Sequence, residues 1–150
     1  MKKITKNKGF TFTELLVVIA IIAILGAGAV LVLNPGEQIA RARDNQREAH
    51  INAILHAVEQ KIFYDDGQWV CEAGPIPGNL TYIGSGEYNL YSCIYPKYLS
   101  DSLFDPQEGN FESISEYYTA YQISQDSVTG RISLNAPHGE TKTIYLGKQP

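Results

Sequence analysis

An uninterrupted apolar stretch from Leu15 to Leu33 constrains this chain more than any other feature. It contains no charged or strongly polar side chain, whereas the sequence from Asn34 onward is polar. As an α-helix, the stretch would extend about 28 Å, close to the roughly 30 Å hydrocarbon core of a bilayer. We therefore expect one membrane-spanning helix, followed by a single globular domain of modest size.

Basic residues before the stretch predict its orientation. Four lysines between Lys2 and Lys8 precede Gly9, so the positive-inside rule predicts a cytoplasmic N-terminus and an exported C-terminal domain. Removal of residues 1–9 would take 4 of the 12 basic residues and leave 8 against 16 acidic ones, a net charge of −8. A domain this acidic is not expected to bind nucleic acid, because phosphate contacts need clustered Lys and Arg.

Two other kinds of N-terminal segment compete with this interpretation. A cleaved secretory signal has an apolar stretch of about 7–15 residues before a small-x-small site, but here Ala27-Gly28-Ala29 lies inside the stretch. The signal anchor of an unrelated membrane protein is not rejected by hydropathy alone. Glu14 argues against both of these alternatives, because a carboxylate beside the start of a membrane helix is energetically costly and normally has a partner.

The order Lys8-Gly9-Phe10, then Glu14, then the apolar stretch resembles the class III signal of type IV prepilins and of type II secretion and competence pseudopilins. The resemblance implies that a prepilin peptidase cuts between Gly9 and Phe10 and methylates the new amino group of Phe10. It also implies that Glu14 pairs with the N-terminal amine of a neighbouring subunit during assembly. The alternative for Glu14 is an acid favoured by the helix macrodipole.

The sequence Asn34-Pro35-Gly36-Glu37 predicts a bend or short break around residues 33–36, followed by a new helix. Residues 37–63 form an amphipathic pattern with one apolar stripe: Ile51, Ile54, Leu55, Val58 and Ile62. The earlier half alternates basic and acidic residues, which predicts a solvated face: Arg41, Arg43, Asp44, Arg47 and Glu48. His50 and His56 share no face for metal binding and are expected in solvent.

The C-terminal part predicts a small antiparallel sheet. Short strand-like runs separated by Gly and Pro turns occupy residues 80–83, 88–94, 117–123, 131–136 and 142–147. The segment from Tyr95 to Pro106 resembles a connector of bacterial pilin-like proteins. The expected fold class is therefore α+β, in which a long N-terminal helix packs on a small antiparallel sheet, as in pilins.

Cys71 and Cys93 lie 22 positions apart, with no further ligands that would make a zinc site. In an exported domain a disulfide is the natural interpretation, and two unpaired buried thiols are the alternative. Asp101, Asp105 and Glu108 do not match a calcium loop, and we expect a solvated acidic turn. No catalytic constellation is present in the sequence, so neither an enzyme nor a metal or other cofactor is expected.

These observations favour a structural subunit of a type IV pilus or a type II secretion-like pseudopilus. Its expected partners are other copies of itself, a prepilin peptidase, the inner-membrane assembly machinery and the membrane. It would lie in the cytoplasmic membrane before assembly and at the cell surface afterwards. The alternative is a minor pilin or a monomeric membrane-anchored binding domain. The expected organisation is a leader (1–9), a membrane and filament helix (10–33), an amphipathic helix (34–66) and a β-rich domain (67–150).

Overall fold

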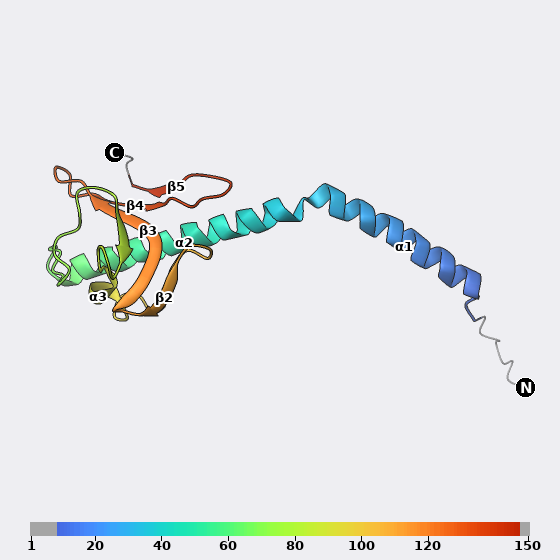
Figure 1. Ribbon diagram of the computed structural model, residues 1–150, viewed down its shortest axis with the longest axis horizontal. Coiled ribbons are helices and arrows are strands. Elements are labelled where there is room, and N and C mark those ends of the chain that lie inside the picture. The colour runs from blue at the N-terminus through green and yellow to red at the C-terminus, as the bar shows by residue number, and fades with distance from the viewer. Residues whose placement is uncertain (1–8, 148–150) are drawn as a thin grey trace, which may run out of the picture. The chain divides into compact units, whose positions relative to one another are not determined.

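The computed structural model describes residues 9–147, apart from the side chains of residues 29–33. The expected leader, residues 1–9, lies outside the described residues except for Gly9. The chain divides after Gln38 into two compact units. The first contains helix α1 (Phe12–Leu33), and the second contains most of helix α2 (Pro35–Tyr64) and the whole sheet (Figure 1).

The break expected around residues 33–36 is present. Asn34 separates the two helices with a left-handed backbone at φ 40°. Its carbonyl accepts the N–H of Glu37 at 3.1 Å, and its side-chain amide donates to the Glu37 carboxylate at 3.3 Å. Pro35 takes the first position of α2, where the missing N–H would have had no intrahelical partner.

The membrane span expected at residues 15–33 falls within α1. Over the part of the chain whose side chains are described, no helix is long and apolar enough to cross a membrane. Residues 29–33, the last five of the expected span, lie outside that part.

Five antiparallel strands form the sheet of the second unit: β1 (Thr81–Gly84), β2 (Asn110–Ser113), β3 (Glu116–Gln125), β4 (Ile132–Ala136) and β5 (Ile144–Leu146). The order is β1-β3-β4-β5, and β2 pairs with the first residues of β3. The long strand β3 is therefore the centre of the sheet. The predicted α+β fold, a long N-terminal helical segment with its amphipathic part packed on a small antiparallel sheet, is confirmed.

The core lies between α2 and one face of the sheet. Ile51, Ile54 and Val58 of the predicted stripe are fully buried, while Leu55 and Ile62 are partly buried against the same cluster. The sheet contributes buried side chains from four strands: Ile83, Tyr117, Tyr121, Ile123, Leu134, Ala136 and Ile144. Each fully buried aliphatic side chain contributes about 1.5–3 kcal/mol, which is how α2 is held on the sheet.

Two details of the predicted sheet are wrong. Residues 88–94 do not form a strand, because Tyr91–Ile94 forms a short helix, α3, and Tyr88 makes an isolated bridge to Ile83. The helical turn stacks the Tyr91 ring on Tyr117, with 4.8 Å between ring centroids. Strand β2 was not expected, because Phe111 is its one apolar residue and the alternating pattern of a half-buried strand is absent.

A bulge bends β3 in its middle. Tyr82 pairs with Gln122 but Gly84 pairs with Tyr118, so three residues of β3 face one residue of β1. Ala120 within the bulge is left-handed, with φ 59°, which costs about 1 kcal/mol or more for a residue with a side chain. The bulge turns the carbonyl of Thr119 to accept the N–H of Asp105 at 2.9 Å.

Cys71 and Cys93 form a disulfide, which was the first of the two alternatives for this pair. The bridge joins the segment after α2 to helix α3 and encloses β1. The sequence separation of 22 residues corresponds to about 3 kcal/mol of loop-closure entropy.

Replacing both cysteines with serine is therefore expected to lower the free energy of unfolding by about 3 kcal/mol. The measurement is urea unfolding of the purified chain in detergent, followed by the fluorescence of Trp69, the only tryptophan. Equal midpoints for the two proteins would show that the bridge contributes nothing to stability.

Candidate functional site

The predicted processing residues lie just before α1. Gly9 and Phe10 are outside any helix or strand, and the Phe10 side chain is 84% exposed. Apart from its two chain neighbours, no described residue has an atom within 4 Å of the position that a Cβ on Gly9 would take. The bond between these two residues is therefore open to an approaching enzyme.

Thr11 and Glu14 form a capping box at the first turn of α1. Thr11 Oγ1 accepts the N–H of Glu14 at 3.3 Å. Glu14 Oε2 in turn accepts the N–H of Thr11 at 2.8 Å and its hydroxyl at 2.7 Å. These bonds satisfy backbone donors that a helix N-terminus leaves open. Glu14 also lines a shallow surface hollow with four neighbours: Phe10, Thr13, Val17 and Val18.

Beyond this turn the described surface of α1 is apolar on all sides. Nine Leu, Val and Ile side chains between Leu15 and Leu25 are each between 44% and 73% exposed. A helix that is apolar all round belongs in the interior of a larger assembly or in a membrane. Glu14 is the one carboxylate of this helix, and it stands at its head.

A second cluster of charged side chains lies in the globular unit, around Arg47 of α2. The Arg47 side chain is fully buried and donates to both oxygens of Asp105, at 2.7 and 3.2 Å. Its Nη1 donates to Asp44 and to Glu140, each at 2.9 Å, and its Nη2 donates to Gln107 at 2.8 Å. The guanidinium thus joins α2 to two separate loops, residues 105–107 and the loop that carries Glu140.

Asp44 completes the connection to the second loop. Its carboxylate accepts the N–H of Glu140 at 2.9 Å, and the N–H and hydroxyl of Thr141 at 2.6 and 2.7 Å. Both Asp44 and Arg47 are buried with 0% exposure, and within the described residues no buried side-chain polar atom lacks a partner. Such satisfaction is needed because a buried charge without a partner costs several kcal/mol.

The surroundings of these carboxyls favour the charged forms. Burial alone would raise the pKa of Asp44, but hydrogen bonds from Glu140, Thr141 and Arg47 outweigh it, and the pKa lies well below its ordinary value. Burial also opposes ionisation of Asp105, whose pKa is nevertheless lowered by the hydrogen bonds from Arg47 and two backbone N–H groups. Hydrogen bonds from Arg43 and Arg47 lower the pKa of Glu140 to about 2.

The prediction of a solvated charged face on α2 is wrong for Asp44 and Arg47, which are buried, whereas Arg41 is exposed and Arg43 and Glu48 are partly exposed. The alternation of charges does not distinguish a solvated face from an internal ion-pair network. The spacing does carry a signal, because residues 44, 47, 51, 54 and 58 follow one stripe of the helix. Extending the buried stripe back from Ile51 would have found both residues.

The solvated acidic turn is also wrong at Asp105, which is buried, whereas Asp101 is exposed. His56 is exposed as expected, but His50 is half-buried and its Nδ1 lies 3.1 Å from the Phe104 carbonyl and 3.0 Å from the Tyr121 hydroxyl. Burial lowers the pKa of His50. Across the residues that the structure describes, no group of three or more His, Cys, Asp or Glu side chains could hold a metal ion.

Replacing Asp105 with asparagine is expected to lower the free energy of unfolding by about 3 kcal/mol, because Arg47 then stays buried without its main countercharge. Glu48→Gln is the matched control: it breaks the exposed contact between Glu48 and Lys142 and is expected to cost less than about 1 kcal/mol. Urea unfolding measures both. Equal losses in the two variants would contradict a structural role for the Arg47 cluster.

The lowered pKa values predict a loss of stability in acid. The folded chain binds fewer protons than the unfolded chain at Asp44, Asp105 and Glu140, so their contribution is complete above pH of about 4.5. It is lost as the pH falls toward about 2, the folded pKa of Glu140. Unfolding measured from pH 7 to pH 2.5 tests this, with Glu140→Gln expected to show a shallower decline. A stability that is flat over this range would contradict it.

Comparison with known protein families gave a match for the N-terminal segment. The family description "Prokaryotic N-terminal methylation motif" matches residues 4–30. No curated protein and no solved structure matches the chain. The motif marks structural pilin-type proteins, and it supports a type IV pilin-like substrate of a prepilin peptidase. Residues 4–30 of this chain are a prokaryotic N-terminal methylation motif, the class III signal peptide of type IV pilins and pseudopilins.

Proposed function

We propose that this chain is a structural subunit of a type IV pilus or of a type II secretion-like pseudopilus. A prepilin peptidase removes the leader, residues 1–9, and methylates the amine of Phe10. Residues 10–33 then hold the subunit in the cytoplasmic membrane, with the N-terminus inside, until the inner-membrane machinery adds it to a filament. The amphipathic helix, residues 34–66, and the β-rich domain, residues 67–150, lie outside.

The apolar surface of α1 carries this proposal. Covering a half-exposed Val, Leu or Ile contributes roughly 1 kcal/mol, and nine such residues lie between Leu15 and Leu25. Contacts with the same helix of other copies would cover them. Hydrophobic burial therefore supplies the force for polymerisation.

Pairing of Glu14 with a neighbour's amine would set the axial alignment of neighbouring α1 helices. Cleavage leaves a positive amine on Phe10, and an unpaired carboxylate buried among apolar helices would cost several kcal/mol. Glu14, Val17 and Val18 line one open hollow on the helix surface, and the amine of a neighbour's Phe10 placed there would offset the charge of the carboxylate. In the free subunit Thr11 supplies the partners of Glu14, so the charge is satisfied before assembly as well.

The alternative is a minor pilin or a monomeric membrane-anchored binding domain at the cell surface. A protein of either kind would have the same leader and the same apolar helix as a major subunit. The amount of this chain in filaments therefore distinguishes the alternatives. A major subunit makes up most of the filament mass, whereas a minor one is rare in filaments and a monomer is absent from them.

Mass spectrometry of the native protein, combined with electron microscopy of surface filaments, tests the function. We expect a mature N-terminus at N-methyl-Phe10 and abundant filaments of this subunit. A chain that still begins at Met1, or that begins beyond residue 28, would exclude the proposed processing. Processed protein without filaments would favour the monomeric alternative.

Glu14→Gln is the matched variant in the same experiment. Glutamine keeps the shape and can still cap the helix, but it lacks the charge. We expect normal cleavage at Gly9, because Glu14 lies beyond the cut bond, and a loss of filaments. Normal filaments from this variant would rule out the pairing with the amine.

A further inference from the structure

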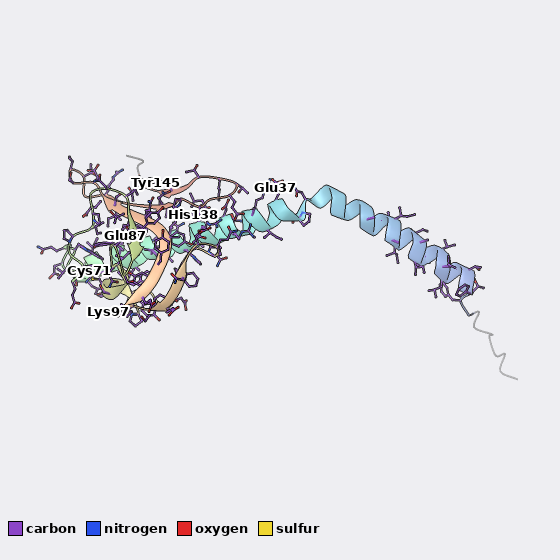
Figure 2. All side chains as sticks on the ribbon, viewed as in Figure 1. Glu37, Cys71, Glu87, Lys97, His138 and Tyr145 are labelled. Atoms are coloured by element: carbon purple, nitrogen blue, oxygen red, sulfur yellow. A yellow bond between two sulfur atoms is a disulfide. The ribbon has the colours of Figure 1, made fainter. Side chains whose placement is uncertain are left out.

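The segment before strand β1 contains a short modification motif. Asn79-Leu80-Thr81 has a threonine two residues after an asparagine, and the residue between them is not proline. This is the acceptor pattern for N-linked saccharides on exported proteins. No other asparagine of the chain has Ser or Thr two residues later. The motif lies between Cys71 and Glu87, which Figure 2 labels on the globular unit.

Strand β3 anchors the chain on both sides of this motif. The carbonyl of Pro77 accepts the N–H of Gln125 at 2.8 Å. Four residues later, Thr81 begins β1 and pairs with Ile123. Residues 78–80 form the short connection between these two anchors, outside any helix or strand. The motif is therefore held at a fixed place on the surface rather than in a long loop.

Both groups that define the motif are accessible. Asn79 is exposed, and among the described residues its side-chain amide has no hydrogen-bond partner. The Thr81 hydroxyl donates to the Asn79 carbonyl at 3.0 Å, which keeps it beside the asparagine. Next to it, a Cβ on Gly78 would meet no described residue within 4 Å other than its chain neighbours. A group attached to the Asn79 amide would therefore replace no contact of the fold.

We propose that Asn79 is a site of N-linked glycosylation and that the transferase recognises the Thr81 hydroxyl. The proposal rests on the proposed function, in which residues 67–150 lie outside the cytoplasmic membrane. The donor is a saccharide carried on a lipid pyrophosphate. A bond forms between Asn79 Nδ2 and C1 of the saccharide as the bond from C1 to the phosphate oxygen breaks. The lipid pyrophosphate leaves, and one amide proton passes to a base of the transferase.

Mass spectrometry of the native chain, isolated from cells that express it, tests this site. The peptide that contains Asn79 is expected to carry the added mass of a saccharide, and fragmentation is expected to assign that mass to Asn79. Asn110 is the control, because it is exposed but is followed by Phe111 and Glu112. Its peptide is expected to be unmodified. An unmodified Asn79 peptide, or a saccharide found only on a hydroxyl group, would overturn the proposal.

Two substitutions of Thr81 separate the motif from mere exposure of the asparagine. Thr81→Ser keeps a hydroxyl and is expected to keep the saccharide. Thr81→Val has nearly the same shape without the hydroxyl, and it is expected to lose the saccharide although Asn79 is unchanged. Cooperative urea unfolding of both variants, followed by Trp69 fluorescence, checks that each is folded. A saccharide that remains on Asn79 in Thr81→Val would contradict recognition of the hydroxyl.

The mature N-terminus, read in the same spectra, keeps the two proposals apart. An unmodified Asn79 on a chain that begins at N-methyl-Phe10 would remove the glycosylation site and leave the proposed function in place. A chain that begins at Met1 would remove the proposed processing, and its Asn79 peptide would still decide the glycosylation site independently.

Discussion

The globular unit depends on a buried arginine. Arg47 lies on the stripe of α2 that faces the sheet, and its guanidinium is enclosed by Asp44, Asp105 and Glu140. Hydrophobic contacts from Ile51 onward attach the later turns of α2 to the sheet. The ion pairs attach the earlier turns to two loops that the apolar core does not reach. Each N–H group of the buried guanidinium needs a well-placed acceptor, because removing these charges from water costs several kcal/mol.

A different constraint governs the first helix. The described part of α1 has no apolar core of its own, since its large side chains are exposed on every side and Glu14 alone is charged. Hydrophobic burial against other copies would then drive assembly, but it is non-directional and does not fix how the helices align. The Glu14 carboxylate would fix the axial position of each helix relative to its neighbours. The same chain would combine a domain stabilised by internal charge pairs with a helix stabilised by neighbours.

The main features of the fold could be read from the sequence because they rest on strong periodic signals. The stripe through Ile51 and Val58 predicted the packing face of α2, and Asn34-Pro35 predicted the break between helices. The leader motif was found from Gly9, Phe10 and Glu14. The Arg47 cluster was not found, since its partner Asp105 lies 58 residues away and only tertiary structure brings the two together. Strand β2 was missed because pairing with β3, rather than its own pattern, makes it a strand.

The central claim is that α1 remains on the mature chain and forms the core of a filament, with Glu14 opposite a neighbour's amine. The structure of the native filament at near-atomic resolution by electron cryomicroscopy tests it most directly. We predict α1 helices packed together along the filament axis, with each Glu14 carboxylate in hydrogen-bond range, about 3 Å, of the Phe10 nitrogen of another subunit. Filaments that lack α1 at their centre, or in which Glu14 keeps only the Thr11 of its own chain, would contradict it.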